Sequence, residues 1–404
     1  MKNRYRIITE LFVVIAILFG SFAVAATKAE ASAGDLKILE TSYRTIQDLE
    51  ILSISPDGKW IAGLNNNRSL VIYDLWKETK VWEDTARKTQ YTDKRYLSWS
   101  PSGRYLTFHE NWERHLYDSD IYMLDTQLWK LTNITDDHYQ GAYLKAVNDE
   151  WAIDCCTGWG RDEQHVYFLR RSKESSTSLF RVCLKSKMQE LIIPSITQRE
   201  GTTSGIFLND KTREIYFSVE LGSGKKTNKG IWSLDLENKE LVQRINDHKL
   251  RDTAVLTSFS SISQRGIYVY PQLLVRLPPD KNLDLFFLWE PNSNKTSPII
   301  SRTLNSTETN PKNRGYKVVN AILSPNGNKL AMVCLTGNRM FHVIIKDLED
   351  NSEKIILKRK DELAGIGLSP GRSGLWLTKD NTLIISTFPM SFPGSRFYRV
   401  KLGT

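Results

Sequence analysis

Residues 51–75 read ILSISPDGKWIAGLNNNRSLVIYDL, and residues 96–132 repeat the same arrangement as YLSWSPSGRYLTFHENWERHLYDSDIYMLDTQLWKLT. In both stretches, two short apolar runs flank a Ser-Pro-x-Gly turn, and a third run ends in an acidic residue. Apolar and polar residues alternate with a period of two on either side of the turn. This pattern predicts short antiparallel strands joined in sequence order and argues against helices.

The turn chemistry explains why the repeat is recognisable. Proline presets φ for the second turn position, and Gly58 and Gly103 tolerate a positive φ because they lack a Cβ atom. The spacing from Ser55 to Ser100 is 45 residues, a period typical of β-propeller blades. Weaker copies of the unit follow at residues 157–171, 205–220, 256–300, 321–334 and 374–387.

These copies predict an all-β protein, a β-propeller of seven four-stranded blades. Six blades is the alternative, because the unit at residues 256–300 lacks the turn signature. The last unit ends after RFYRVKL and is one strand short, whereas DLKILET at residues 35–41 has no hairpin partner of its own. We therefore expect residues 35–41 to close the last blade by pairing with residues 396–402, which removes an exposed sheet edge.

The repeat resembles that of the TolB-like β-propellers. The SPDG turn, the KWIAG and RYLTF strands, the IYMLD strand and the KLTN ending carry this resemblance, which covers roughly residues 50–402. Similar repeats form the propellers of prolyl-oligopeptidase-type enzymes, but this chain has no room for their hydrolase domain. The resemblance implies an all-β toroid with partners outside the cytoplasm in many members, and it implies no single activity.

The N-terminus has the features of an export signal. Lys2, Arg4 and Arg6 precede an uncharged apolar run from residue 11 to residue 26, and small residues at Ala23 and Ala25 suit cleavage. We expect a signal peptide at residues 1–25, a linker with the closing strand at 26–49, and the propeller at 50–404. The protein is then secreted or held in the cell envelope. The alternative is an uncleaved segment that anchors the chain in a membrane.

Charge and cysteine content narrow the classes of partner. The formal net charge is +9, and removal of residues 1–25 takes away three basic residues and one acidic residue, leaving +7. The basic residues are scattered, and no stacking motif is present, so nucleic acid is not an expected partner. The spacing of the four cysteines matches no metal or haem motif. One disulfide at most is expected, between Cys183 and either Cys155 or Cys156, with Cys334 as a buried thiol.

No local catalytic motif is present. A G-x-S-x-G nucleophile elbow, a phosphate-binding loop, an EF-hand loop and an H-E-x-x-H motif are all missing from the sequence. No cofactor and no metal are therefore expected. The sequence favours a non-catalytic protein.

A candidate binding surface follows from the order of strands in a blade. Connections between second and third strands, and between successive blades, emerge on the face opposite the Ser-Pro-x-Gly turns, and loops on such a face commonly carry function. The second blade and its exit place a group of charged, imidazole and aromatic side chains there: His109, Glu110, Trp112, Arg114, His115, Asp136, Asp137, His138 and Tyr139. The alternative is a solvated loop with Trp112 packed on the rim.

These observations predict an exported, non-catalytic β-propeller that binds a protein, peptide or glycan partner at this loop face. Membrane contact is expected only through the signal segment, if it is retained. The alternative is a lyase or hydrolase that acts on polysaccharide from the central funnel, because propeller sites assemble from distant loops and leave no local motif.

Overall fold

The computed structural model describes a large part of the chain and is composed of β-strands. The described residues are 38–46, 49–67, 69–85, 97–109, 119–136, 152–160, 162–172, 176–198, 204–209, 214–221, 228–246, 255–262, 267–273, 287–290, 295–298, 301–304, 315–324, 328–336, 340–360, 362–364, 375–377, 381–389 and 395–403. The predicted export signal lies outside these residues. Among the described residues, no helix is long and apolar enough to cross a membrane.

Seven antiparallel sheets account for the described strands. The first three contain β2 (Glu50–Ile54), β3 (Trp60–Leu64), β4 (Leu70–Asp74) and β5 (Thr79–Glu83); β6 (Ser98–Trp99), β7 (Tyr105–His109), β8 (Ile121–Asp125) and β9 (Lys130–Asn133); and β10 (Ala152–Trp159), β11 (His165–Ser172), β12 (Ser176–Cys183) and β13 (Gln189–Gln198). The fourth and fifth contain β14 (Ser204–Asn209), β15 (Glu214–Leu221), β16 (Asn228–Asp235) and β17 (Leu241–Asn246); and β18 (Val255–Ile262), β19 (Ile267–Leu273), β20 (Phe287–Glu290) and β21 (Lys295–Pro298).

The last two sheets differ in composition. The sixth is a four-stranded meander of β22 (Tyr316–Leu323), β23 (Lys329–Thr336), β24 (Met340–Asp347) and β25 (Glu353–Lys360). The seventh has five strands, namely β1 (Ile38–Ile46), β29 (Ser395–Leu402), β28 (Thr382–Pro389), β26 (Glu362–Ala364) and β27 (Leu375–Leu377). Both β26 and β27 pair with β28. The short strand β26 was not predicted from the sequence.

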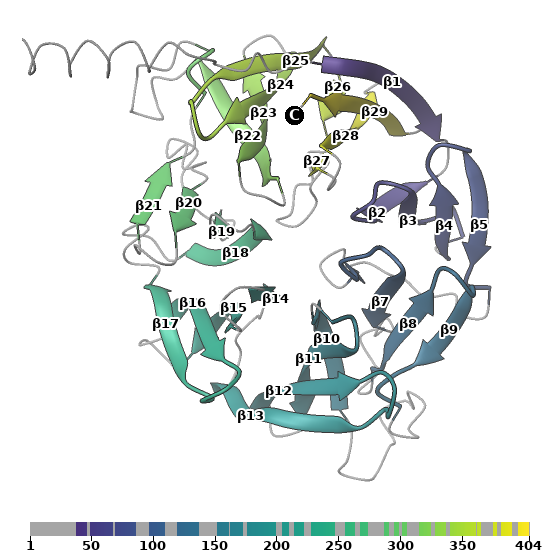
Figure 1. The fold of residues 1–404 in the computed structure, drawn as a ribbon, viewed down its shortest axis with the longest axis vertical. Helices are drawn as coiled ribbons and strands as arrows, with labels where there is room; N and C mark the ends of the chain where they lie inside the picture. The colour runs from purple at the N-terminus through teal and green to yellow at the C-terminus, as the bar shows by residue number, and fades with distance from the viewer. Residues whose placement is uncertain are drawn as a thin grey trace, which may run out of the picture.

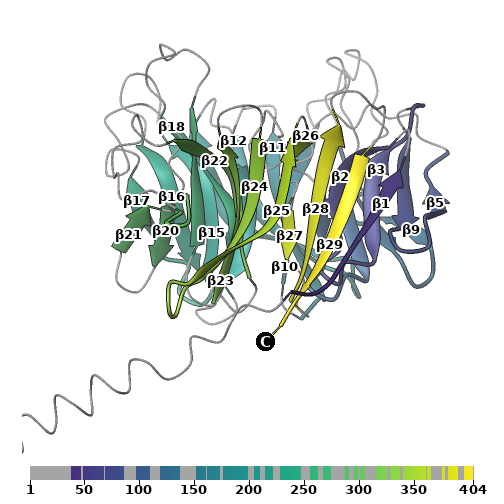
Figure 2. The same cartoon turned by 90° about the horizontal axis from the view of Figure 1, so that it is seen from above.

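The sheets stand around a common centre, as Figure 1 shows, with β2, β10, β14 and β22 near the centre and β5, β13, β17 and β25 at the outside. The strands run between two opposite faces of the molecule (Figure 2). We call the face that carries residues 55–59, 100–104 and 162–164 the turn face. We call the opposite face, where β7 ends at His109 and β8 begins, the loop face. The predicted all-β architecture of four-stranded antiparallel sheets is confirmed.

The Ser-Pro-x-Gly signature is explained by a side-chain hydrogen bond. Ser55 Oγ accepts a hydrogen bond from the backbone N–H of Trp60 at 2.9 Å, and Ser100 Oγ accepts one from Tyr105 at 3.1 Å. The serines are buried, so this bond satisfies a donor that water does not reach. Gly58 and Gly103 have φ of 69° and 78°, which confirms the predicted left-handed turn position.

The acidic residue at the end of the third strand starts a second recurring turn. Asp74 Oδ1 accepts backbone hydrogen bonds from Trp76 at 3.1 Å and Lys77 at 3.0 Å. Four residues after the aspartate, Glu78 takes a left-handed φ of 55°. The two turns of one sheet are joined, because Leu75 N donates to Lys59 O at 3.0 Å. Both turns therefore lie on the turn face.

The N-terminal strand pairs with the C-terminal strand. β1 runs antiparallel to β29, with Thr41 opposite Val400 and Ile46 opposite Ser395. The strand occupies Ile38–Ile46 rather than the predicted residues 35–41, because pairing continues to the first residue of β29. Residues 35–37 lie outside the described part of the chain.

Apolar cores form between neighbouring sheets. One cluster joins the first and second sheets through residues such as Ile72 and Phe108. Another joins the seventh and first sheets, with Phe397 and Ile384 against Ile61 and Val71. Both faces of an inner strand are therefore buried, which removes the polar alternation expected of a strand with one face in water.

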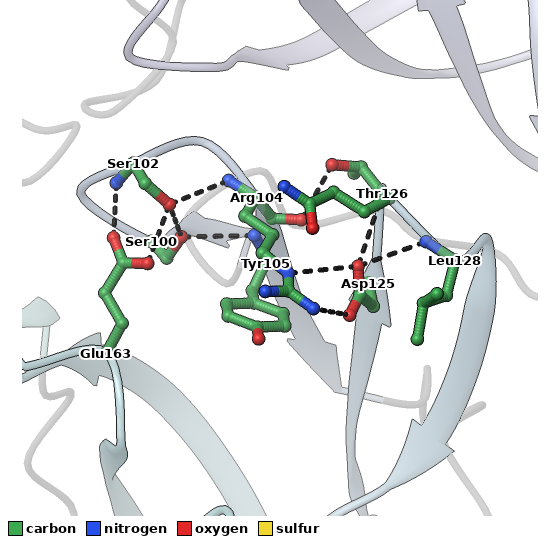
Figure 3. Close-up of polar contacts among 9 residues, drawn as sticks. Ser100, Ser102, Arg104, Tyr105, Asp125, Thr126, Leu128 and Glu163 are labelled. Carbon is green, nitrogen blue, oxygen red and sulfur yellow. Dashed lines mark hydrogen bonds and ion pairs between the residues drawn. The ribbon is translucent and has the colours of Figure 1, made fainter.

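Neighbouring turns on the turn face also contact one another through polar groups. Figure 3 shows the Glu163 carboxylate of the third sheet at the Ser102 turn of the second sheet, where it accepts hydrogen bonds from Ser102 N and, at 2.7 Å, from Ser102 Oγ. A Cβ atom on Gly103 would lie 3.3 Å from the Asp57 carboxylate of the first sheet. In both pairs, the third residue of one turn meets the fourth residue of the next turn.

The predicted disulfide of Cys183 is not formed. Cys183 is a free thiol. Strands β10, which holds Cys155 and Cys156, and β12 are separated by β11, and strands two places apart lie about 10 Å from each other. A disulfide requires Cα atoms within about 7 Å, so the sheet order itself prevents the bond. Cys334 is a buried thiol outside any disulfide, as predicted.

Candidate functional site

The loop face between the second and third sheets is the candidate site. Of the predicted site residues, the structure describes His109 and Asp136. The others lie outside the described residues: Glu110, Trp112, Arg114, His115, Asp137, His138 and Tyr139. Asp136 is exposed, as expected of a loop residue.

His109 was predicted as a loop residue, and this prediction is wrong. It is the last residue of β7, and its side chain is 7% exposed. Its Nδ1 lies 3.4 Å from the Oγ of Ser119, which lies two residues before the start of β8. The strand extends to His109 because its backbone continues the pairing with Ile121 on β8. His109 is therefore buried below the loop face instead of lying on its surface.

Ser119 links the second sheet to the third. Asp154 N on β10 donates to Ser119 O at 2.8 Å, and Ser119 Oγ donates to Asp154 O at 3.4 Å. These hydrogen bonds join the two sheets near the loop face, whereas the contacts of Glu163 with Ser102 join them at the turn face. The end of β7, the start of β8 and the start of β10 are therefore fixed relative to one another.

A buried ion pair stabilises the same region. Asp154 is 1% exposed, and its carboxylate accepts hydrogen bonds from Arg170 Nε at 2.7 Å and Nη2 at 2.6 Å. The Arg170 guanidinium also lies over the ring of Phe180, 4.9 Å from its centroid. A bidentate pair of this kind fixes the orientation of the two side chains as well as balancing their charges, because both carboxylate oxygens bond to the planar guanidinium.

The exit of the second sheet is held by a second carboxylate. Asp120 Oδ2 accepts a hydrogen bond from Asn133 Nδ2 at 2.7 Å, and Thr135 Oγ1 lies 3.5 Å from Asp120 Oδ1. Thr135 Oγ1 in turn accepts the backbone N–H of Ile121 at 2.8 Å. Asp120 and Thr135 are buried. The residues just before Asp136 are therefore anchored beside the start of β8.

These contacts form one polar frame, which we define as His109, Ser119, Asp120, Thr135, Asp154 and Arg170. The frame flanks the two stretches of sequence that hold the predicted site residues, 110–118 and 137–151. Its described polar groups bond to one another, so the arrangement suits positioning of neighbouring residues. Among the described residues, no group of three His, Cys, Asp or Glu side chains is placed to hold a metal ion.

Sequence reasoning missed most of this frame. Asp154 and Arg170 lie in strands, where a charged residue reads as solvent-facing, and their pairing depends on the register of β10 and β11. A signal was present for Ser119 and Asp120, since both directly precede the IYMLD strand. Short polar residues beside a strand often bond the backbone of a neighbouring segment.

Comparison with known proteins gives distant structural likenesses. No protein-family model and no curated protein matches the chain. Among solved structures, it is similar to the Cps50 (Swd1) β-propeller domain of Myceliophteria thermophila, at 13% identity and a TM-score of 0.49, over 90% of this chain and 100% of that domain. A prolyl endopeptidase aligns at 10% identity and a TM-score of 0.49, over 87% of this chain, which spans 47% of the endopeptidase.

TolB from Acinetobacter baumannii is a further likeness. It aligns at 11% identity and a TM-score of 0.37, over 89% of this chain and 80% of that one. The assignment of the present chain to an all-β fold of four-stranded sheets comes from its own strand pairing.

Proposed function

We propose that this chain is an exported, TolB-like β-propeller of seven blades that binds a protein partner through the loop face and performs no catalysis. In this proposal, residues 50–404 form the propeller, residues 1–25 direct export, and β1 closes the ring beside β29. The pairing of β1 with β29 and the apolar cluster between the seventh and first sheets support the closed ring.

The observation that carries the binding proposal is the buried polar frame. Its carboxylates, hydroxyls and guanidinium are used in internal hydrogen bonds, at the ends of two stretches rich in charged and aromatic residues. A rigid scaffold that supports variable connections is the usual construction of a recognition surface. Trp112 and Tyr139 are the aromatic residues we expect to supply most of the binding energy.

Partner capture tests the site. The purified secreted chain is immobilised and exposed to an extract of the envelope and medium, and captured proteins are identified by mass spectrometry. Trp112→Ala should abolish capture. Leu128→Ala is the matched control, because Leu128 is an apolar side chain 68% exposed on the turn face. Equal loss with both variants, or retention with Trp112→Ala, contradicts the proposed face.

Catalysis and export have separate tests. Turnover of polysaccharide, measured as new reducing ends or unsaturated sugar, would contradict the binding proposal and support a lyase or hydrolase. Capture of a peptide or glycan in place of a protein would support the loop face as the binding surface but contradict a protein partner. N-terminal sequencing of the exported chain should begin near Ala26, and recovery of the full-length chain in membranes would replace secretion with anchoring.

A further inference from the structure

The third sheet carries a cysteine at a position where four other sheets carry an aspartate. This position is the last residue of the third strand in each sheet, occupied by Cys183 in β12 and elsewhere by Asp74, Asp125, Asp235 and Asp347. The backbone of the turn is the same, because the residue four places later is left-handed in each: Lys187, Glu78, Trp129, Lys239 and Asn351. Cys183 therefore occupies the site of a carboxylate.

The groups around this position are arranged to accept a negative charge. In the second sheet, Asp125 Oδ1 accepts backbone N–H groups two and three residues later, from Gln127 at 2.8 Å and Leu128 at 3.3 Å. At Cys183, the corresponding donors are the backbone N–H groups of Lys185 and Ser186 and the Ser186 side chain, and they lower the pKa of the thiol. Sulfur accepts such bonds far better as thiolate than as thiol, so the turn favours the ionised form.

A histidine faces the sulfur from the neighbouring strand. His165 lies directly opposite Cys183, and Leu184 N donates to Gln164 O at 2.8 Å in the adjoining pair. His165 and Cys183 are therefore a non-hydrogen-bonded pair, whose Cβ atoms lie about 4.5 to 5.5 Å apart. Asp162 Oδ2 lies 2.7 Å from His165 Nδ1 and orients the ring. Cys183, His165 and Asp162 form one cluster on the turn face.

The cluster changes the acidity of the thiol. The hydrogen bonds from the Ser186 side chain and from the Ser186 and Lys185 backbone, together with the charge of His165, lower the pKa of Cys183 from 9.0 to about 7. Cys183 is also partly exposed, whereas Cys334 is fully buried. Cys183 is therefore both readily ionised and accessible to a reagent in solution.

We propose that Cys183 is a nucleophilic thiolate that undergoes thiol–disulfide exchange with low-molecular-weight disulfides. The Cys183 sulfur attacks one sulfur of the disulfide, a new S–S bond forms, and the S–S bond of the reagent breaks. The departing thiolate takes a proton from water, so the protein gains one thiol adduct and the reagent is released as one free thiol. His165 acts on the sulfur through its charge, and Asp162 holds the His165 ring in place. The adduct lies on the turn face, opposite the proposed binding face.

Alkylation and mixed-disulfide formation test this site in the full secreted chain. Iodoacetamide is used at a series of pH values, oxidised glutathione serves as the disulfide probe, and peptide mass spectrometry locates each product. At pH 7 a thiol of pKa about 7 is roughly 50-fold more ionised than one of pKa 9. The lower pKa also makes the thiolate less nucleophilic, so the expected gain in rate is only about 6-fold. The pH profile is therefore the decisive readout, with a midpoint near 7 expected at Cys183.

Three variants separate the roles. Cys183→Asp restores the residue of the other four sheets, so it should keep the melting temperature and lose the glutathione adduct. His165→Gln should move the midpoint of the Cys183 profile upward while Cys183 remains fully reactive at pH 9. Cys334→Ser should leave the profile unchanged. The proposal is overturned if the midpoint at Cys183 lies near 9, if the adduct forms on Cys155 or Cys156 instead, or if His165→Gln leaves the profile where it was.

Discussion

Asp154 and Arg170 are directly opposite each other on β10 and β11, and their two-pronged ion pair lies below the loop face with the carboxylate 1% exposed. Removal of one partner leaves a buried charge without its counterpart, which costs about 3 to 5 kcal/mol. We expect Arg170→Met to lower the free energy of unfolding by about this amount. Urea denaturation of the purified chain measures it.

The control for this pair lies in the same sheet. Arg181 and Glu190 form an ion pair between β12 and β13 whose side chains are 33% and 52% exposed. Exposed pairs of this kind contribute about 0 to 1 kcal/mol, so Arg181→Met should have a small effect. Similar losses in the free energy of unfolding for Arg170→Met and Arg181→Met would show that burial does not increase the contribution of the Asp154 pair to stability.

Glu353 on β25 gives the protein a predicted sensitivity to acid. Burial raises the pKa of this carboxyl, but the backbone hydrogen bonds from Thr303 and Arg302, the Ser301 hydroxyl and the charge of Lys346 outweigh burial and lower it below 4.5. A carboxyl whose pKa is lower in the folded state contributes its full stability above the unfolded pKa. That contribution is lost as the pH falls through the folded pKa.

Melting temperature against pH tests this prediction. The wild-type curve should fall as the pH drops below 4.5, and the curve of Glu353→Gln should start lower at pH 7 and fall less steeply. Parallel curves for Glu353→Gln and the wild type would show that Glu353 does not cause the loss of stability in acid.

Gly103 is predicted to be the least replaceable residue of its turn. Its φ is +78°, and an added Cβ would meet the Asp57 carboxylate at 3.3 Å. The left-handed conformation costs a residue with a side chain about 1 to 2 kcal/mol, so Gly103→Ala should destabilise by at least that amount. Gly315→Ala is the control, since no atom lies within 4 Å of its added Cβ. Equal stability of the two variants would contradict the strain.

Deletion of β1 should destabilise the whole molecule. Without Ile38–Ile46, β29 keeps β28 as a partner but loses β1 and presents an unpaired edge. A chain lacking residues 26–46 should melt at a lower temperature and associate with itself in size-exclusion chromatography. A chain lacking residues 26–37 should resemble the full mature chain. Unchanged cooperative unfolding after loss of β1 would refute ring closure by this strand.

Much of the fold could be predicted from the sequence because its signals are local. The Ser-Pro-x-Gly turns and the aspartate that ends the third strand set backbone geometry within six residues, as the Ser55 and Asp74 hydrogen bonds demonstrate. The unpaired N-terminal strand was also predictable, since strand count alone left the last unit incomplete. The limits of β1 and the existence of β26 were not, because pairing extends as far as the partner strand allows.

The candidate site was predicted less well, since its described residues come together only through tertiary structure. His109 had the sequence context of a loop, but pairing with β8 placed it in the buried frame. The sequence by itself determined the type of strand, the turns and their repeat, because these depend on neighbours along the chain. Tertiary structure alone decided that Asp154 meets Arg170, that Glu163 meets Ser102, and that Cys183 takes the place of a carboxylate opposite His165. Those relationships depend on register between strands and on contact between sheets, which no local pattern of residues encodes.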